Sequence, residues 1–152
     1  MEIKTQITVN ATPDKVWAVL TDFENYPNWN PFIKSITGKP KVGSQIAVKI
    51  VPPQGKSMTF KPTVLVFERN KEFRWMGRLL FRGVFDGEHK FELSDNGNGT
   101  TTFNHSEMFT GLLVNLFKRQ LEDNTKNGFE LMNESLKKFV ESDDRESDVF
   151  IK

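Results

Sequence analysis

Apolar and polar residues alternate with a period of two at the start of the chain and again through its middle. The stretch from Ile3 to Val9 alternates with polar neighbours, which is the pattern of a strand with one buried face. The same period recurs from residue 36 to about residue 109, between turn signals rich in Gly, Pro and Asn, and predicts about six further strands. Pro62 falls inside one of them, which favours an edge strand or a bulge at that point.

Two regions break this alternation with helical patterns. The Thr-Pro-Asp sequence at residues 12–14 is typical of a helix start, because Thr can accept a free backbone N–H, Pro needs no donor and Asp favours the positive end of the helix dipole. We expect this short helix to end at about Leu20. A long helix is expected from Thr110 or Gly111 to about Glu141, because apolar residues recur there at steps of three and four.

The segment Asp22–Phe32, DFENYPNWNPF, places four aromatic rings and two prolines within eleven residues. Asp22 can cap a second short helix, but Pro27 and Pro31 each remove a donor and bias the preceding residue away from helical angles. Broken turns are therefore expected here. Either a plug in the core or the wall of a binding cavity would explain so much apolar surface in an irregular segment.

The apolar stripe of the long helix is interrupted at its middle, and a charged segment follows its end. Asn124, Thr125 and Gly128 fall where the apolar stripe would continue. Gly costs about 1 kcal/mol relative to Ala inside a helix, so we expect a neighbouring group to need space at Gly128, although a wet patch or a kink would also explain the three residues. Residues 142–152, SDDRESDVFIK, are charged and are expected to fray, which sets the domain at residues 1–141.

Composition excludes several function classes. A length of 152 residues predicts one domain, and 21 Lys and Arg against 20 Asp and Glu leave a net charge of +1, so nucleic acid is not an expected partner. No apolar run has the length of a membrane span, and no signal-peptide pattern is present. We therefore expect a cytoplasmic protein without stable membrane insertion. The chain has no Cys, which excludes disulfides and thiolate chemistry.

Both histidines of the chain are expected on one face of a hairpin, together with a glutamate. Pairing the strands about a turn near Gly97 puts His89 opposite His105 and Gly87 opposite Glu107. A slip of two residues would instead pair His89 with Glu107 and would keep the same facing. The opposite face is expected to be wet, because it carries Asp86, Glu88, Lys90, Glu92, Thr102, Asn104 and Ser106.

The inner face combines large rings with positions that lack side chains. Trp75 on the preceding strand shares this face, and Gly77 and Gly87 open space on it. A carboxylate and two imidazoles are costly in a solid apolar core unless they have partners, whereas ordered water or the polar end of a ligand would satisfy them. This argument favours a cavity over a filled core.

Three stretches of the sequence together resemble a known superfamily. They are VWAVLTDFENYPNWNPFI, GVFDGEHKFEL, and GTTTFNHSEMFTGLL leading into the last helix. The chain resembles the START-like (SRPBCC) superfamily, specifically its polyketide cyclase/dehydrase-like group, over nearly its whole length. The most specific parts are the segment Val16–Phe32 and the run His105-x-Glu107-x-Phe109-x-Gly111.

The resemblance implies an α+β helix-grip fold. A seven-stranded curved antiparallel sheet would wrap around the long C-terminal helix, with two short helices after the first strand, and would leave a tunnel between sheet and helix. The two short helices and their link would form a hinged wall or lid at one end, although plain packing of their rings is an equal alternative. The ligand-binding residues expected from these arguments are Phe23, Tyr26, Trp29, Phe32, Phe60, Trp75, Phe85, His89, Phe91, Phe103, His105, Glu107, Phe109, Asn124 and Gly128.

Three functions follow as alternatives. The first, which we favour, is carriage or sensing of a hydrophobic small molecule of the lipid, isoprenoid or polyketide/aromatic class in the tunnel. The second is an enzyme of the polyketide cyclase/aromatase type that uses Glu107, His105 or His89 for proton transfer. The third is a co-chaperone-like protein-interaction domain. No cofactor is expected. The two histidines and Glu107 could form a facial metal triad, but we favour the hypothesis of a satisfied structural network, so no metal is expected.

Overall fold

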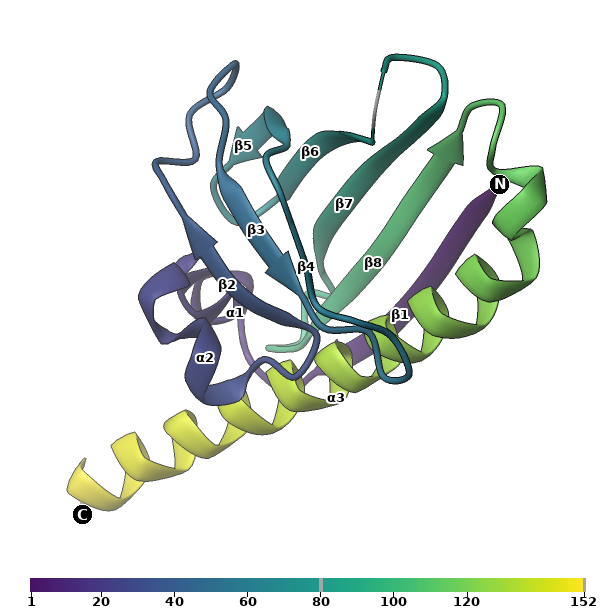
Figure 1. Cartoon of the computed structure of the whole chain (residues 1–152). Coiled ribbons are helices and arrows are strands. Elements are labelled where there is room, and N and C mark those ends of the chain that lie inside the picture. Colours follow the sequence, from purple (N-terminus) through teal and green to yellow (C-terminus); the bar gives the residue numbers. More distant parts are fainter. Residues whose placement is uncertain (80, 152) are drawn as a thin grey trace.

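The chain folds into two antiparallel sheets and one long helix that lies along one side of them (Figure 1). The computed structural model describes residues 1–79 and 81–151, with side chains up to residue 142 except residue 80. In chain order the elements are β1 (Glu2–Val9), α1 (Pro13–Thr21), η1 (Phe23–Asn25), α2 (Tyr26–Trp29), β2 (Ile33–Thr37), β3 (Ala47–Ile50), β4 (Met58–Phe60), β5 (Thr63–Glu68), β6 (Glu72–Leu79), β7 (Phe85–Asp95), β8 (Thr101–Thr110), η2 (Asn115–Phe117) and α3 (Lys118–Ile151). The predicted α+β helix-grip class and the two short helices after the first strand are confirmed.

The strands divide into a five-stranded sheet, ordered β1-β8-β7-β6-β5, and a three-stranded sheet, ordered β2-β3-β4. The described residues thus form eight strands where the sequence predicts seven. Pro62 lies between β4 and β5, so its predicted place inside a strand is wrong, while the expectation of a sheet edge agrees with the position of both flanking strands. Pro62 has no N–H for a ladder, and its carbonyl accepts from Ile46 N instead. A single bridge between Gln45 and Thr63 joins the two sheets at this point.

The hairpin of β7 and β8 takes the slipped register. His89 pairs with Glu107, and Phe91 pairs with His105, so the register that puts the two histidines opposite each other is wrong. The two strands continue as far as the pair Asp95 and Thr101, which moves the centre of the turn from residue 97 to residue 98. Both histidines and Glu107 face inward as predicted, because a slip of two residues keeps each side chain on its face.

The long helix begins later than predicted because the chain first makes a turn. Gly111 has a φ of +124°, and a Cβ there would lie 2.5 Å from the Val84 carbonyl oxygen. The backbone therefore passes close to the loop before β7, forms η2, and enters α3 only at Lys118. At its other end α3 continues to Ile151, past the predicted end at Glu141. Fraying of residues 142–152 stays a prediction, since the side chains from residue 143 onward lie outside the described residues.

The solid core fills the half of the molecule next to α1. Phe73, Phe91 and Phe103 are fully buried there, and Trp17 of α1 packs on Phe67 with ring centroids 5.3 Å apart. The outer face of β7 and β8 is less exposed to solvent than predicted. Asp86 and Ser106 are buried on it; the Asp86 carboxylate accepts from Gly83 N at 3.1 Å and faces Arg78 Nε at 3.8 Å.

No helix in the described residues is long and apolar enough to cross a membrane.

Candidate functional site

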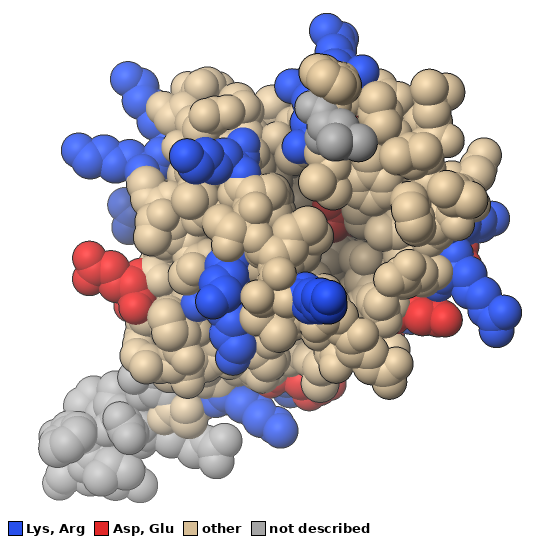
Figure 2. Space-filling model, viewed as in Figure 1, with Lys and Arg blue, Asp and Glu red and all other residues tan. Residues whose placement is uncertain are grey.

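A cavity of about 630 Å³ occupies the half of the molecule away from α1. It lies between the two sheets and the first turns of α3, and Figure 2 shows a hollow on this face, bordered mainly by uncharged side chains. Its apolar lining is Phe32, Ile33, Ile50, Pro52, Met58, Phe60, Trp75, Leu79, Phe85, Phe109, Leu113, Phe117 and Leu121. Its polar lining is Lys56, Arg78, His89, Glu107, Gln120, Asn124 and Thr125. The cavity is therefore mainly apolar, with few polar groups.

Two glycines on neighbouring strands leave room in the cavity wall. Gly77 and Gly87 are paired across β6 and β7. A Cβ at Gly87 would lie 2.5 Å from Glu107 Oε1, and one at Gly77 would lie 3.3 Å from the Phe60 ring. Gly87 thus provides the space that the Glu107 carboxyl group occupies.

A chain of hydrogen bonds runs from the cavity wall into the core. Glu107 Oε2 lies 3.3 Å from His89 Nδ1, and His89 Nε2 lies 2.9 Å from His105 Nε2. On the far side, His105 Nδ1 lies 3.0 Å from Asn133 Oδ1, and Asn133 Nδ2 donates to Thr5 Oγ1 at 2.8 Å. The polar groups expected to need partners inside the molecule therefore have them.

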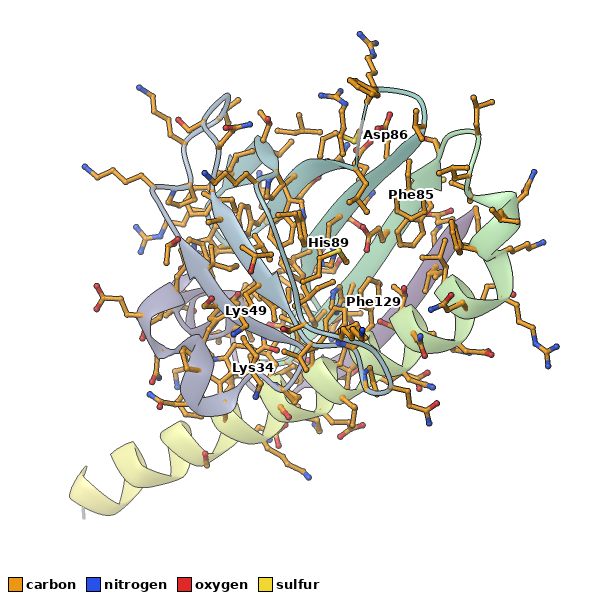
Figure 3. The ribbon with its side chains drawn as sticks, viewed as in Figure 1. Lys34, Lys49, Phe85, Asp86, His89 and Phe129 are labelled. Carbon is orange, nitrogen blue, oxygen red and sulfur yellow. The ribbon has the colours of Figure 1, made fainter. Side chains whose placement is uncertain are left out.

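The two imidazole rings are held between aromatic rings. His89 stacks on Trp75 with centroids 4.6 Å apart and planes 12° apart. His105 stacks on Phe129 of α3 at 3.7 Å and 17°. Figure 3 shows His89 and Phe129 between the sheet and α3, with Phe85 further along β7. This packing fixes both ring planes, and both imidazoles are buried.

Burial sets the charge states of these groups. It raises the pKa of Glu107 to about 8 and lowers the pKa of His89 to about 3. The pKa of His105 is also lowered well below its ordinary value, first by burial and then by the adjacent His89. At neutral pH both imidazoles are therefore uncharged and Glu107 holds its proton. The side chain of Glu107 is 17% exposed, toward the cavity.

The structure brings about half of the predicted ligand-binding residues together at the cavity. Those that line it are Phe32, Phe60, Trp75, Phe85, His89, Glu107, Phe109 and Asn124. Those that do not line it are Phe23, Tyr26, Trp29, Phe91, Phe103, His105 and Gly128. Phe91 and Phe103 point inward as expected but lie deeper, where the core is solid. His105 is fully buried behind His89.

The aromatic segment before β2 is packed into the core. Tyr26 is fully buried and its hydroxyl donates to the Leu20 carbonyl. Trp29 stacks on Phe139 of α3 with centroids 6.2 Å apart, and Phe23 packs edge-on against Tyr26. This arrangement favours the packing alternative over a lid, and only Phe32 at the end of the segment reaches the cavity.

Gly128 makes room for Phe32. A Cβ at Gly128 would overlap the Phe32 ring, so the ring lies directly on the helix at this position. The predicted need for space is therefore met by a side chain of the protein and not by a ligand.

Three residues of the polar chain and its packing are missing from the sequence prediction. Phe129 and Asn133 lie four residues apart on α3 and both contact His105. Thr5 is the polar member of the inward face of β1, between Ile3 and Ile7. Its place in the period-two pattern is a signal that the sequence does contain.

The two histidines contact each other and do not converge on a common point with Glu107. Among the described residues, no group of three or more His, Asp or Glu side chains could hold a metal ion.

The fold and the cavity define a START-like helix-grip protein. The family model for polyketide cyclase / dehydrase and lipid transport matches residues 1–141, so the chain belongs to that family. The resemblance inferred from the sequence is thereby confirmed.

Solved structures share this fold at low sequence identity. A START superfamily protein from Mycobacterium smegmatis gives a TM-score of 0.73 at 22% identity, over 93% of this chain and 97% of its own. The Zhui aromatase/cyclase from Streptomyces sp. R1128 gives 0.73 at 13% identity, over 93% of each chain. A norcoclaurine synthase from Thalictrum flavum gives 0.73 at 14% identity, over 95% of this chain and 96% of its own. A search of the curated proteins gave no match.

Proposed function

We propose that this protein binds a hydrophobic or amphipathic small molecule in the cavity, as a carrier or sensor. The observation that carries the proposal is a cavity of about 630 Å³ with a mainly apolar lining and a few polar side chains, among them the buried carboxyl group of Glu107. Ligand sites typically have this volume, an apolar lining and a few polar groups that fix orientation. Lipids, isoprenoids and polyketide-like or aromatic molecules are the ligand classes that fit such walls.

Proton transfer is the second candidate function. Burial raises the pKa of Glu107 to about 8, close to the pH at which a general acid or base is most effective. The similar folds include an aromatase/cyclase and a norcoclaurine synthase, which support an enzyme on fold-level analogy alone. We place binding first because the cavity and its mainly apolar lining support it directly, whereas catalysis rests on one perturbed carboxyl group and on analogy of fold.

The first experiment is native mass spectrometry of the purified protein, with extraction and identification of any bound molecule. A bound lipid, isoprenoid or polyaromatic supports the proposal. An apo mass, together with no thermal shift across a panel of hydrophobic ligands, contradicts it.

A matched pair of variants tests whether binding takes place in the cavity. Thr125 lines the cavity and Lys126 is exposed beside it on α3. Thr125→Phe should fill part of the cavity and weaken the binding of an apolar probe, methylanthracene, by about tenfold or more, which corresponds to about 1.4 kcal/mol. Lys126→Phe adds the same ring outside the cavity and should leave the affinity for this probe unchanged. Equal affinities for both variants would place the ligand elsewhere.

A further inference from the structure

The hydrogen-bond chain has a direction, which is set at the end away from the cavity. Thr5 Oγ1 donates its single hydrogen to the His105 carbonyl at 3.0 Å. Only its lone pairs then face Asn133, so the Asn133 amide must donate through Nδ2. The reversed amide would place two oxygen acceptors 2.8 Å apart with no hydrogen between them. Asn133 Oδ1 therefore faces His105 as an acceptor.

This direction determines which nitrogen carries the hydrogen in each of the two imidazole rings. Because Asn133 Oδ1 can only accept, His105 carries its hydrogen on Nδ1 and presents Nε2 as an acceptor. His89 must then donate from Nε2 across the 2.9 Å contact. A neutral His89 has no second hydrogen, so its Nδ1 is an acceptor that faces Glu107.

An acceptor at His89 Nδ1 requires Glu107 to donate. The contact at 3.3 Å therefore places the carboxyl proton on Oε2, and Glu107 is a neutral carboxylic acid whose hydrogen is already used. Its other oxygen, Oε1, lies over Gly87 and has no hydrogen-bond partner among the described residues. Oε1 is thus a carbonyl-type acceptor, on a residue that faces the cavity.

The other charged groups around the cavity do not alter this assignment. Lys56 and Arg78 line its outer part; Lys56 is exposed, and Arg78 is 46% exposed and faces Asp86. Neither lies within ion-pair distance of Glu107 in the described structure. The residues of β1, β6 and α3 that pack around Glu107 bring no charged side chain to it; Gln120, Asn124 and Thr125 are the polar ones on α3.

We propose that the cavity selects an uncharged ligand whose polar end is a hydroxyl group, an alcohol or a phenol, which donates to Glu107 Oε1. This inference rests on the proposed binding function and specifies its ligand class. A ketone or ether has no hydrogen to donate to Oε1. A carboxylate would bring a charge and a second acceptor to it, and an ammonium would bring an unpaired charge into an apolar cavity.

The test compares four probes that share one apolar scaffold. They are anthracenylmethanol, methylanthracene, anthracenylmethylamine and anthracenecarboxylate, all substituted on the central ring, and titration calorimetry at pH 7 measures their affinities for the purified chain. A net hydrogen bond is worth about 0.5–1.5 kcal/mol. The alcohol should therefore bind between about twofold and tenfold more tightly than methylanthracene, and the amine and the carboxylate should bind more weakly than either.

Two variants at position 107 identify the atom that is responsible. Glu107→Gln can donate from Nε2 to His89 and still present Oε1, so it should keep the preference for the alcohol. Glu107→Leu has no acceptor and should lose that preference while still binding methylanthracene. An amine that binds best to the wild-type protein, and no longer does so in Glu107→Gln, would show an ionised Glu107 and overturn the inference.

The failure of this inference can be distinguished from the failure of the proposed function. If methylanthracene binds and the alcohol binds no better, the cavity is a ligand site but the hydroxyl selectivity is wrong. If none of the four probes binds, the proposed function fails and the ligand class fails with it.

Nitrogen-15 NMR tests the proton positions independently of any ligand. The chain has only two histidines, so the His89→Gln variant assigns both rings. Hydrogen on Nε2 of His89 and on Nδ1 of His105 is expected at pH 7. Hydrogen on Nδ1 of His89 would reverse the chain and overturn the assignment of Glu107 as an acid.

Discussion

Between pH 6.5 and pH 8 the free energy of unfolding of the wild-type protein should fall because of Glu107, and Glu107→Gln should abolish this fall. In the unfolded chain the Glu107 carboxyl group ionises around its ordinary pKa of 4.5, whereas burial holds the folded pKa at about 8. Between these values the folded protein binds one more proton than the unfolded chain. Its free energy of unfolding therefore falls as the pH rises, by at most about 1.4 kcal/mol per pH unit.

The two histidines act in the opposite direction and on the acid side. Their folded pKa values lie below the ordinary 6.5, so below pH 6.5 the unfolded chain binds the extra protons and stability falls as the pH decreases. Stability should therefore be greatest near pH 6.5. From there to pH 8, Glu107 alone should lower it by about 2 kcal/mol.

The assay is urea unfolding followed by tryptophan fluorescence at several pH values between 6.5 and 8. The difference in unfolding free energy between Glu107→Gln and the wild-type protein should grow by about 2 kcal/mol in favour of the variant across this interval. Glu130→Gln, at an exposed position of α3, is the control and should show no such growth. A constant difference for Glu107→Gln would show that Glu107 is already ionised at pH 6.5 and would refute the reasoning.

Two further substitutions test the packing around the site by urea denaturation. Gly128→Ala should lower stability by about 1–3 kcal/mol, because the new Cβ would overlap Phe32, even though Ala is the better helix former by about 1 kcal/mol; Asn127→Ala on the exposed side of α3 is its control, and a more stable Gly128→Ala would contradict the contact. Asn133→Ala should cost about 1–3 kcal/mol, because it leaves the His105 Nδ1–H buried without an acceptor; wild-type stability in this variant would show that water replaces the amide.

The sequence predicts the elements well and their connections poorly. The period of two along β7 and β8 reports only which side chains face inward, and it is the same for either register of the hairpin. The register depends on the turn, where Gly97 and Gly99 both have positive φ and the loop is centred on residue 98. The start of α3 likewise depends on a contact between Gly111 and Val84, which the local apolar pattern does not contain.

The candidate site also has residues that the sequence identifies and residues that it does not. His89 and Glu107 could be found from the sequence because polar residues on an apolar face require an explanation. Which rings line the cavity and which fill the core could not be found, because Phe91 and Phe109 occupy equivalent positions in the alternation. The difference comes from their position along the sheet: Phe91 lies at the α1 end, where Phe73 packs against it.

The selectivity proposed for the cavity is determined by residues that a ligand would not touch. Thr5 and Asn133, 128 residues apart in the sequence, fix the direction of the hydrogen-bond chain at the end away from the cavity. A donor facing His105 Nδ1 in place of the Asn133 oxygen would reverse both imidazoles, turn His89 Nδ1 into a donor and allow Glu107 to ionise. The same cavity walls would then favour an ammonium over a hydroxyl group. The packing of α3 on β1 thus determines which polar group of a ligand the cavity prefers, while the apolar walls determine the size of the ligand.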